Sequence, residues 1–121
     1  MAGLNILIIE DDELIAEILT DIIEDMGHTV VGIADTEKKA IALAAHARPS
    51  FLICDVTLDE GNGISAARTI CRDRAIPHFF TSGDVARVKA EIPGAIVLEK
   101  PFRRNDVAAA IDQALADSTK S

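Results

Sequence analysis

Short apolar runs alternate with segments of helical spacing along the whole chain, and this alternation restricts the fold more than any other feature. Continuous apolar runs bounded by polar residues predict buried strands at 5–10, 50–55 and 95–100. The segments 29–34 and 78–82 are rich in β-branched and aromatic residues, which also predicts strands. Because the three longest runs are continuous, they are typical of a parallel sheet that is buried on both faces.

The segments between these strands have the periodicity of helices. In 14–26, apolar residues recur every three or four positions, which predicts an amphipathic helix that Gly27 ends. A second helix is predicted over 37–47, with Thr36 as its N-cap. The remaining predicted helices cover about 64–74, 84–91 and 104–116.

Strand and helix therefore alternate five times, which predicts parallel strands joined by right-handed crossovers. The predicted fold class is α/β, a doubly wound five-stranded parallel sheet with five helices. A chain of 121 residues is the size of one domain. We expect a single domain over 1–121, with a frayed tail at about 117–121 and no output domain within the chain.

The acidic composition excludes some classes of function. The chain has 20 acidic and 12 basic residues and a net charge of −8. This charge repels phosphate backbones, so no nucleic-acid partner is expected. No apolar run approaches the ~20 residues that a membrane span needs, and the N-terminus does not have the pattern of a signal peptide. We therefore expect no membrane association and a cytoplasmic location.

The cysteines and histidines do not suggest a site of their own. The spacing of Cys54 and Cys71 fits neither a zinc site nor a C-x-x-C redox pair, so both are expected to be buried as small hydrophobic residues. None of the histidines sits at a strand end that is predicted to carry chemistry, and surface or structural roles are expected for them. They are His28, His46 and His78.

Polar residues gather where the predicted strands end. In an open parallel sheet, ligands bind outside the carboxyl ends of the strands. Because those ends share one edge of the sheet, the polar side chains that follow the strands are expected to lie close together. In chain order they are Glu10, Asp11, Asp12, Asp55, Thr81, Ser82, Lys100 and Pro101.

This set of residues suits phosphoryl transfer. Glu10, Asp11 and Asp55 would crowd three carboxylates together, which requires a compensating cation. Mg²⁺ favours such oxygen ligands, together with phosphate oxygens. Lys100 would add a second positive charge and Thr81 a hydroxyl donor. Asp55 stands alone at its strand end and is the candidate nucleophile, whereas the acidic pair is better suited to holding metal.

Each of these residues also has a purely structural interpretation. The acidic triplet can be a favourable charge at a helix N-terminus, and Asp55 can cap a helix or a turn. Lys100 can be a solvated surface lysine, and Thr81 an ordinary strand residue. What favours the functional interpretation is that all of them fall at the same edge of the predicted sheet.

The ordered motifs resemble the receiver domain of two-component response regulators over essentially the whole chain. Glu10 and Asp11 in "IIEDDE" are similar to the metal-binding acidic pair of that family. Asp55 in "LICDVTLDEGNG" matches the phosphoacceptor. Thr81 in "FFTSG" matches the switch hydroxyl, and Lys100 in "LEKPF" matches the phosphate-sensing lysine.

The resemblance implies further details of the site and the fold. Asp11 takes the position of a direct metal ligand, and Thr57 sits where the family uses a backbone carbonyl as a ligand. Ser82 and Pro101 take supporting positions, and the bond from Lys100 to Pro101 is typically cis in this family. The implied fold is flavodoxin-like, (βα)5, with strand order 2-1-3-4-5. The stand-alone, single-domain type fits the expected lack of an output domain.

The resemblance also implies a function and its partners. A histidine kinase or histidine phosphotransferase would donate a phosphoryl group from phosphohistidine to Asp55, with Mg²⁺, or Mn²⁺ as a substitute, as the cofactor. Thr81 and Lys100 would then move toward the phosphoryl oxygens and bias the region of the fourth helix and fifth strand. The domain would signal through a downstream protein partner, or act as a phosphate shuttle or sink. It would assist its own phosphorylation and dephosphorylation without being a turnover enzyme.

Two positions depart from the family pattern. Val97 stands where an aromatic switch residue is usual, so the aromatic half of the switch is missing. Asp59 stands where proline is common, so the loop after Asp55 is expected to be more mobile or more acidic than usual. The phosphoryl-transfer residues are intact, and the departures concern the conformational readout.

Three alternatives belong to other classes of function. A hydrolase of the haloacid dehalogenase type needs a second Asp two residues after the nucleophile, where this chain has Thr57. A flavodoxin-like module that binds nucleotide or flavin would need a phosphate-binding loop after the first strand, where this chain has acidic residues. A receiver-like adaptor that acts without phosphorylation is the third, and Val97 is the feature that suggests it.

Overall fold

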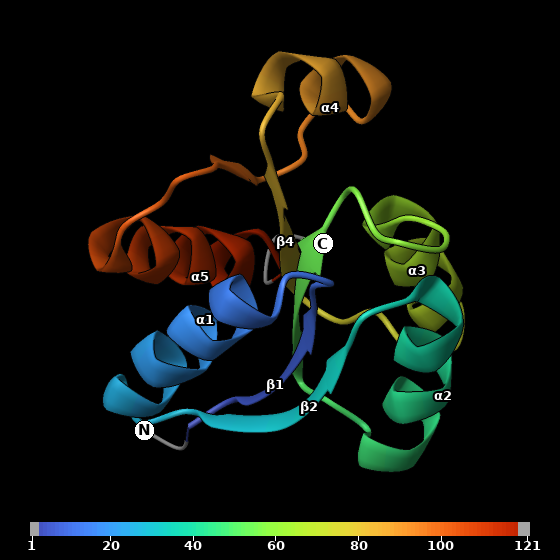
Figure 1. Cartoon of the computed structure of the whole chain (residues 1–121), viewed down its shortest axis with the longest axis vertical. Helices are drawn as coiled ribbons and strands as arrows, with labels where there is room; N and C mark the ends of the chain where they lie inside the picture. The colour runs from blue at the N-terminus through green and yellow to red at the C-terminus, as the bar shows by residue number, and fades with distance from the viewer. Residues whose placement is uncertain (1–2, 119–121) are drawn as a thin grey trace.

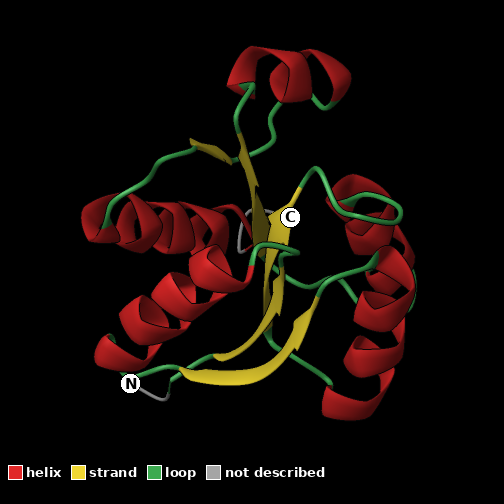
Figure 2. Cartoon of the chain, in the orientation of Figure 1, coloured by secondary structure: helices red, strands yellow, loops and turns green. Residues whose placement is uncertain are grey.

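The computed structural model describes residues 3–118 and confirms the α/β fold that the sequence predicts (Figures 1 and 2). Five strands form one sheet in the order β2-β1-β3-β4-β5, and every neighbouring pair is parallel. This is the flavodoxin-like strand order that the family resemblance implies. The strands are β1 (Asn5–Ile9), β2 (Thr29–Ala34), β3 (Phe51–Asp55), β4 (His78–Ser82) and β5 (Val97–Glu99).

Helices cover both faces of the sheet. In Figure 1, α1 and α5 lie on one side, α2 and α3 lie on the other, and α4 stands apart at the top. The helices are α1 (Glu13–Asp25), α2 (Glu37–Ala47), α3 (Gly63–Ile70), α4 (Val85–Glu91) and α5 (Arg104–Ser118).

Two helix ends differ from the prediction. The helix expected over 64–74 ends at Ile70, because the chain has to turn back toward the start of β4, and Cys71 forms the C-cap. The last helix runs on to Ser118, so the first part of the expected tail is helical. The remainder of that tail, residues 119–121, lies outside the described residues.

The core consists of two apolar layers, one on each face of the sheet. Successive side chains of a strand point to opposite faces. In β1, Ile6 and Ile8 pack toward α1 and α5, whereas Leu7 and Ile9 pack toward α2 and α3. All four are fully buried. This arrangement explains why the strand sequences are continuous apolar runs.

Polar side chains cap the N-termini of the helices that begin at the carboxyl edge of the sheet. Asp12 caps α1, where its Oδ1 accepts hydrogen bonds from the backbone N–H groups of Leu14 at 2.9 Å and Ile15 at 3.1 Å. Thr36 caps α2, and its hydroxyl accepts from Lys39 N–H at 3.1 Å. The structural interpretation of the acidic triplet therefore holds for Asp12, which leaves the other two carboxylates for the site.

Within residues 3–118, none of the helices combines the length and the apolar character that crossing a bilayer requires.

Candidate functional site

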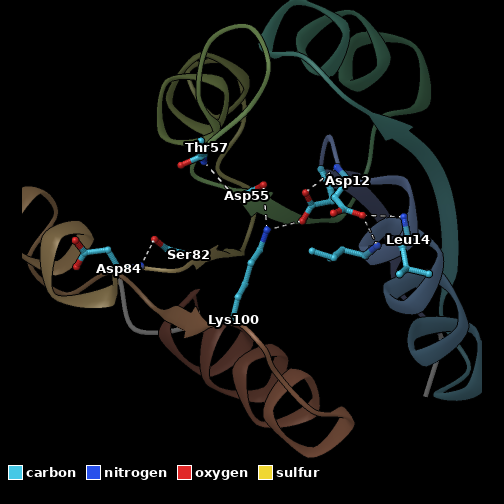
Figure 3. Close-up of polar contacts among 9 residues, drawn as sticks. Asp12, Leu14, Asp55, Thr57, Ser82, Asp84 and Lys100 are labelled. Carbon is cyan, nitrogen blue, oxygen red and sulfur yellow. Dashed lines mark hydrogen bonds and ion pairs between the residues drawn. The ribbon is translucent and has the colours of Figure 1, made fainter.

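The carboxyl ends of four strands bring the predicted site residues together. Glu10 and Asp11 follow β1, and Asp55 is the last residue of β3. Thr81 lies opposite Asp55 in the register of β3 and β4. Lys100 follows β5 and reaches across this edge of the sheet (Figure 3). The expectation that these residues share one place is therefore confirmed.

Three carboxylates form a cluster that can hold a cation. Glu10, Asp11 and Asp55 each offer an oxygen, and these oxygens all lie within 4.8 Å of one another. Glu10 and Asp55 are 2% and 4% exposed, whereas Asp11 is half-buried. Among residues 3–118, no other group of three acidic, histidine or cysteine side chains has this geometry. The donor set is all oxygen, which fits a hard divalent ion such as Mg²⁺.

Lys100 places a positive charge beside two of these carboxylates. Its Nζ lies 3.0 Å from Oε1 of Glu10 and 3.1 Å from Oδ2 of Asp55 (Figure 3). Burial alone would lower the pKa of Lys100, but the Glu10 and Asp55 carboxylates outweigh it and raise the pKa above its usual value. Lys100 is therefore an ammonium ion at neutral pH.

Glu10 shows that one ammonium ion does not fully compensate the cluster. Burial, followed by the neighbouring Asp55 carboxyl, raises the pKa of Glu10 to about 7. The backbone N–H of Asp12, which donates to Glu10 Oε2 at 3.1 Å, and the Lys100 ammonium act in the opposite direction. Because the ionised carboxylates repel one another, a bound divalent cation would be stabilised here.

The loop that follows Asp55 returns to pack beneath it. The backbone N–H of Thr57 donates to Oδ1 of Asp55 at 3.2 Å (Figure 3), and the N–H of Gly63 donates to the carbonyl of Val56 at 3.2 Å. A Cβ at Gly63 would collide with the backbone carbonyl of Asp55, so only glycine allows this close approach. The sequence predicts that the Thr57 carbonyl is a metal ligand, and this role stays a prediction.

Thr81 has a buried hydroxyl without a partner. The residue is 1% exposed, and its Oγ1 has no hydrogen-bond partner among the described residues. Because an unpaired buried hydroxyl is costly, such a group often serves a ligand. The neighbouring Ser82 has a partner within the protein, since its Oγ accepts the N–H of Asp84 at 2.9 Å at the start of α4 (Figure 3). The Lys100–Pro101 bond is cis, as the resemblance implied.

The two departures from the family pattern have distinct surroundings. Val97 is half-buried and packs against the apolar layer that faces α2 and α3. Asp59 is exposed, and its carboxyl meets that of Asp11, which raises the pKa of Asp59 through a shared hydrogen bond and like-charge repulsion. The loop therefore adds a fourth carboxyl at the rim of the cluster, in line with the predicted acidic character.

Glu37 is a residue near the site that sequence reasoning missed. It lies at the first position of α2 and contacts the loop that follows Asp55. As a sequence feature it is an ordinary acidic residue in the first turn of a helix, and its position alone gives no sign of the contact.

A family model for the response regulator receiver domain matches residues 6–112. The chain belongs to this family. Among its relatives, the phyllosphere-induced regulator PhyR of Methylorubrum extorquens is 36% identical over 115 residues, which are 92% of this chain and 43% of that protein. The transcriptional regulatory protein PdtaR of Mycobacterium tuberculosis is 30% identical over 116 residues, which are 93% of this chain and 57% of that protein. The receiver thus spans about half the length of these two relatives.

Solved receiver structures have the same fold. The receiver domain of Erythrobacter litoralis PhyR matches with a TM-score of 0.88 at 32% identity and covers 96% of this chain and 92% of that chain. PhyR from Brucella abortus matches with a TM-score of 0.89 at 34% identity over 97% of this chain and 49% of that chain. The fold of this chain is therefore that of a response regulator receiver.

PhyR and PdtaR are both named as regulators. The chain is accordingly a response regulator receiver domain. This match favours the receiver over the haloacid dehalogenase alternative.

Proposed function

We propose that Asp55 of this receiver accepts a phosphoryl group from a phosphohistidine, with Mg²⁺ held by Glu10, Asp11 and Asp55. The observation that carries the proposal is the buried edge where Lys100 contacts two carboxylates of the cluster, at 3.0 and 3.1 Å. The backbone carbonyl of Thr57 is proposed as a further ligand. Mn²⁺, which accepts the same oxygen ligands, would substitute for Mg²⁺.

In the proposed reaction, an oxygen of the Asp55 carboxylate attacks the phosphorus atom as the bond from phosphorus to the histidine nitrogen breaks. The imidazole leaves with the electron pair of that bond, and Asp55 becomes an acyl phosphate. Mg²⁺, when bound by Glu10, Asp11 and Asp55, would supply neutralising charge to the phosphoryl oxygens. Lys100 is already charged and beside Asp55, so it neutralises part of the added charge without a proton transfer.

Thr81 gives the phosphorylated form a new hydrogen bond. Its hydroxyl has no partner among the described residues and lies next to Asp55 in the sheet register. A phosphoryl oxygen on Asp55 would accept this hydrogen bond and draw Thr81 inward. Ser82 follows Thr81, and its hydroxyl accepts the N–H of Asp84, the N-cap of α4. A displacement of Thr81 would therefore be transmitted to the start of α4.

The partners follow from this chemistry. A histidine kinase or a histidine phosphotransferase is the proposed phosphoryl donor. The proposed signalling partner is a downstream protein that distinguishes the phosphorylated from the unphosphorylated domain. A relative from Bartonella quintana is described as an anti-anti-sigma factor, which supports signalling by protein contact at the level of analogy. The cytoplasmic location and the single-domain organisation stay predictions.

Intact-mass measurement after incubation with Mg²⁺ and acetyl phosphate or phosphoramidate tests the proposal. We expect one phosphoryl adduct on the wild-type protein and none on Asp55→Asn or after chelation of Mg²⁺. Asp112→Asn is the matched control, because it removes an exposed carboxylate of α5 that is not among the site residues, and the adduct should remain. An adduct that persists in Asp55→Asn would contradict the proposal, as would a wild-type protein that accepts phosphoryl neither from these donors nor from a phosphorylated phosphotransferase.

A further inference from the structure

The loop from Val56 to Asn62, between β3 and α3, is closed on itself. Gly63 N–H donates to the Val56 carbonyl at 3.2 Å. Thr57 and Asn62 form an isolated antiparallel bridge across the loop. Thr57 therefore faces Asn62 within the loop, and its backbone N–H contacts Asp55 at 3.2 Å. The position of Asn62 thus bears directly on the residue beside the proposed phosphoacceptor.

Glu37 of α2 makes three hydrogen bonds at the end of this loop that leads into α3. Its Oε1 accepts from the backbone N–H of Asn62 at 3.1 Å, and its Oε2 accepts from the hydroxyl of Ser65 at 2.6 Å. Its own backbone N–H donates to the carbonyl of Glu60 at 3.1 Å. One residue of α2 thereby contacts the end of the loop and the first turn of α3.

Through these contacts, a residue of α2 supplies hydrogen-bond acceptors to the N-terminus of α3. Asn62 is the N-cap of α3, and its Oδ1 accepts the N–H of Ser65 at 2.8 Å. In a capping box, a Glu or Gln three residues after the N-cap accepts the N–H of the cap residue. Here that position is Ser65, whose side chain is too short to make this bond. The carboxylate of Glu37 takes its place and also binds the Ser65 hydroxyl.

Gly61 shows how closely the loop and Glu37 fit together. Its φ of +83° lies in the left-handed region that favours glycine. A Cβ at this position would also collide with the side chain of Glu37. The loop backbone is therefore packed against Glu37, which restricts movement of the loop toward α2.

We infer that Glu37 is a positioning residue of the acidic site: it fixes the 56–62 loop through the N-cap of α3 and thereby holds Thr57 beside Asp55. The inference rests on the proposed function, since it concerns the same metal and phosphoryl site. Glu37 does not belong to the carboxylate cluster itself, so its effect on a bound cation would pass through the loop and not through direct ligation. The connection runs from Glu37 to Asn62, across the bridge to Thr57.

The dissociation constant for Mg²⁺, measured by calorimetry, tests the inference. Glu37→Ala removes both side-chain acceptors, and we expect Mg²⁺ binding to weaken by about three- to tenfold, less than the ~10–100-fold typical of losing a direct outer-shell partner of a metal ligand. Glu37→Gln keeps one acceptor for Asn62 N–H and can donate to the Ser65 hydroxyl, so it should restore most of the affinity. Glu24→Ala is the charge-matched control, since Glu24 is exposed at the C-terminal end of α1, whereas the acidic site lies at the N-terminal end of that helix.

Two further readouts separate positioning from a general loss of stability. Hydrogen exchange of peptides that cover 56–63 should accelerate in Glu37→Ala, while exchange in β1 stays unchanged. Ser65→Ala combined with Glu37→Ala should weaken Mg²⁺ binding no more than Glu37→Ala alone, because both changes remove the same contact. A variant that is less stable in urea, yet binds Mg²⁺ with the wild-type dissociation constant when folded, would overturn the inference.

The experiment also distinguishes failure of the inference from failure of the proposed function. If the wild-type protein binds Mg²⁺ and Asp11→Asn does not, the metal site stands, and equal binding by Glu37→Ala then overturns the role of Glu37 alone. A wild-type protein that binds no Mg²⁺ would overturn the metal part of the proposed function and this inference with it.

Discussion

Lys100 donates a hydrogen bond to Oε1 of Glu10 at 3.0 Å, although 90 positions of sequence separate the two residues. The bond crosses the sheet edge from the end of β5 to the end of β1, and the same ammonium contacts Asp55 on β3. A single side chain thus connects three strand ends. Lys100 remains 22% exposed at its side chain, whereas the Glu10 side chain is 1% exposed. The pair is therefore held at the boundary between the core and solvent.

Replacement of Lys100 by Met should destabilise the metal-free protein. The change leaves Glu10 and Asp55 buried together without their ammonium partner. Breaking a fully buried pair costs about 3–5 kcal/mol. Because Lys100 is partly exposed, we expect about 1–3 kcal/mol at pH 8 and low salt. Urea unfolding followed by circular dichroism measures this loss, since the chain has no Trp or Tyr for fluorescence.

Added Mg²⁺ should stabilise the Lys100→Met protein more than the wild type, because the carboxylates would then have no competing cation. Lys38→Met is the control, as Lys38 is an exposed lysine of α2. Equal stability of the Lys100→Met and Lys38→Met proteins would show that the ammonium does not compensate the cluster.

Replacement of Thr81 by Val should stabilise the unphosphorylated protein. The hydroxyl is buried and has no partner among the described residues, and Val has a similar shape without the polar atom. Removing an unsatisfied buried hydroxyl should add about 1 kcal/mol to the free energy of unfolding. The same variant should still form the Asp55 adduct in intact-mass measurements but gain less thermal stability from phosphorylation than the wild type.

Thr81→Ser is the comparison for this prediction. It keeps the hydroxyl and removes a buried methyl group, so its unfolding free energy should fall by about 1 kcal/mol. The interpretation of Thr81 would be wrong if Thr81→Val proved less stable than Thr81→Ser.

The sequence predicted the fold and the place of the site because both depend on local patterns. Continuous apolar runs mark strands that are buried on two faces, and the buried layers of β1 have this arrangement. Parallel strands all end at the same edge, so polar residues that directly follow them must meet. Glu10, Asp55 and Lys100 could therefore be grouped before their contacts were known.

Contacts between separate elements could not be predicted in this way. Glu37 reaches Asn62 and Ser65 only because α2 and α3 lie side by side, which depends on packing of the whole layer. Cys71 was expected to be buried, but it is half-buried at the C-cap of α3, where the helix ends. Cys54, in the middle of the sheet, is buried as expected.

Replacement of Val88 by Ala should loosen α4 without unfolding the protein. Val88 is the one buried residue among those of α4, which is only seven residues long and would not be stable alone. The loss of two buried methyl groups should lower the stability of the packed helix by about 1–2 kcal/mol. Hydrogen exchange in 85–91 should accelerate roughly ten- to thirtyfold, while exchange in β1 and β3 changes little. Val85→Ala, at a half-buried position of the same helix, should have a smaller effect.

The two cysteines should differ in reactivity toward iodoacetamide. Burial raises the pKa of Cys54, which is fully buried. Burial acts to raise the pKa of Cys71, but the hydrogen bond with the His78 side chain outweighs it and lowers the pKa below its usual value. The thiolate is the reactive form, so a lower pKa gives more thiolate at a given pH. In the folded protein, we expect alkylation at Cys71 and protection of Cys54.

The pH dependence of this alkylation tests the role of His78. The rate for Cys71 should rise with pH and level off at a lower pH than for an ordinary cysteine. In His78→Asn, which removes the imidazole, the midpoint should move to higher pH. Cys71→Ser identifies the alkylated residue by loss of the mass adduct, and urea-unfolded protein shows both thiols at full reactivity. An unchanged midpoint in folded His78→Asn would mean that the imidazole does not stabilise the thiolate, and the half-buried thiol would then owe its reactivity to exposure alone.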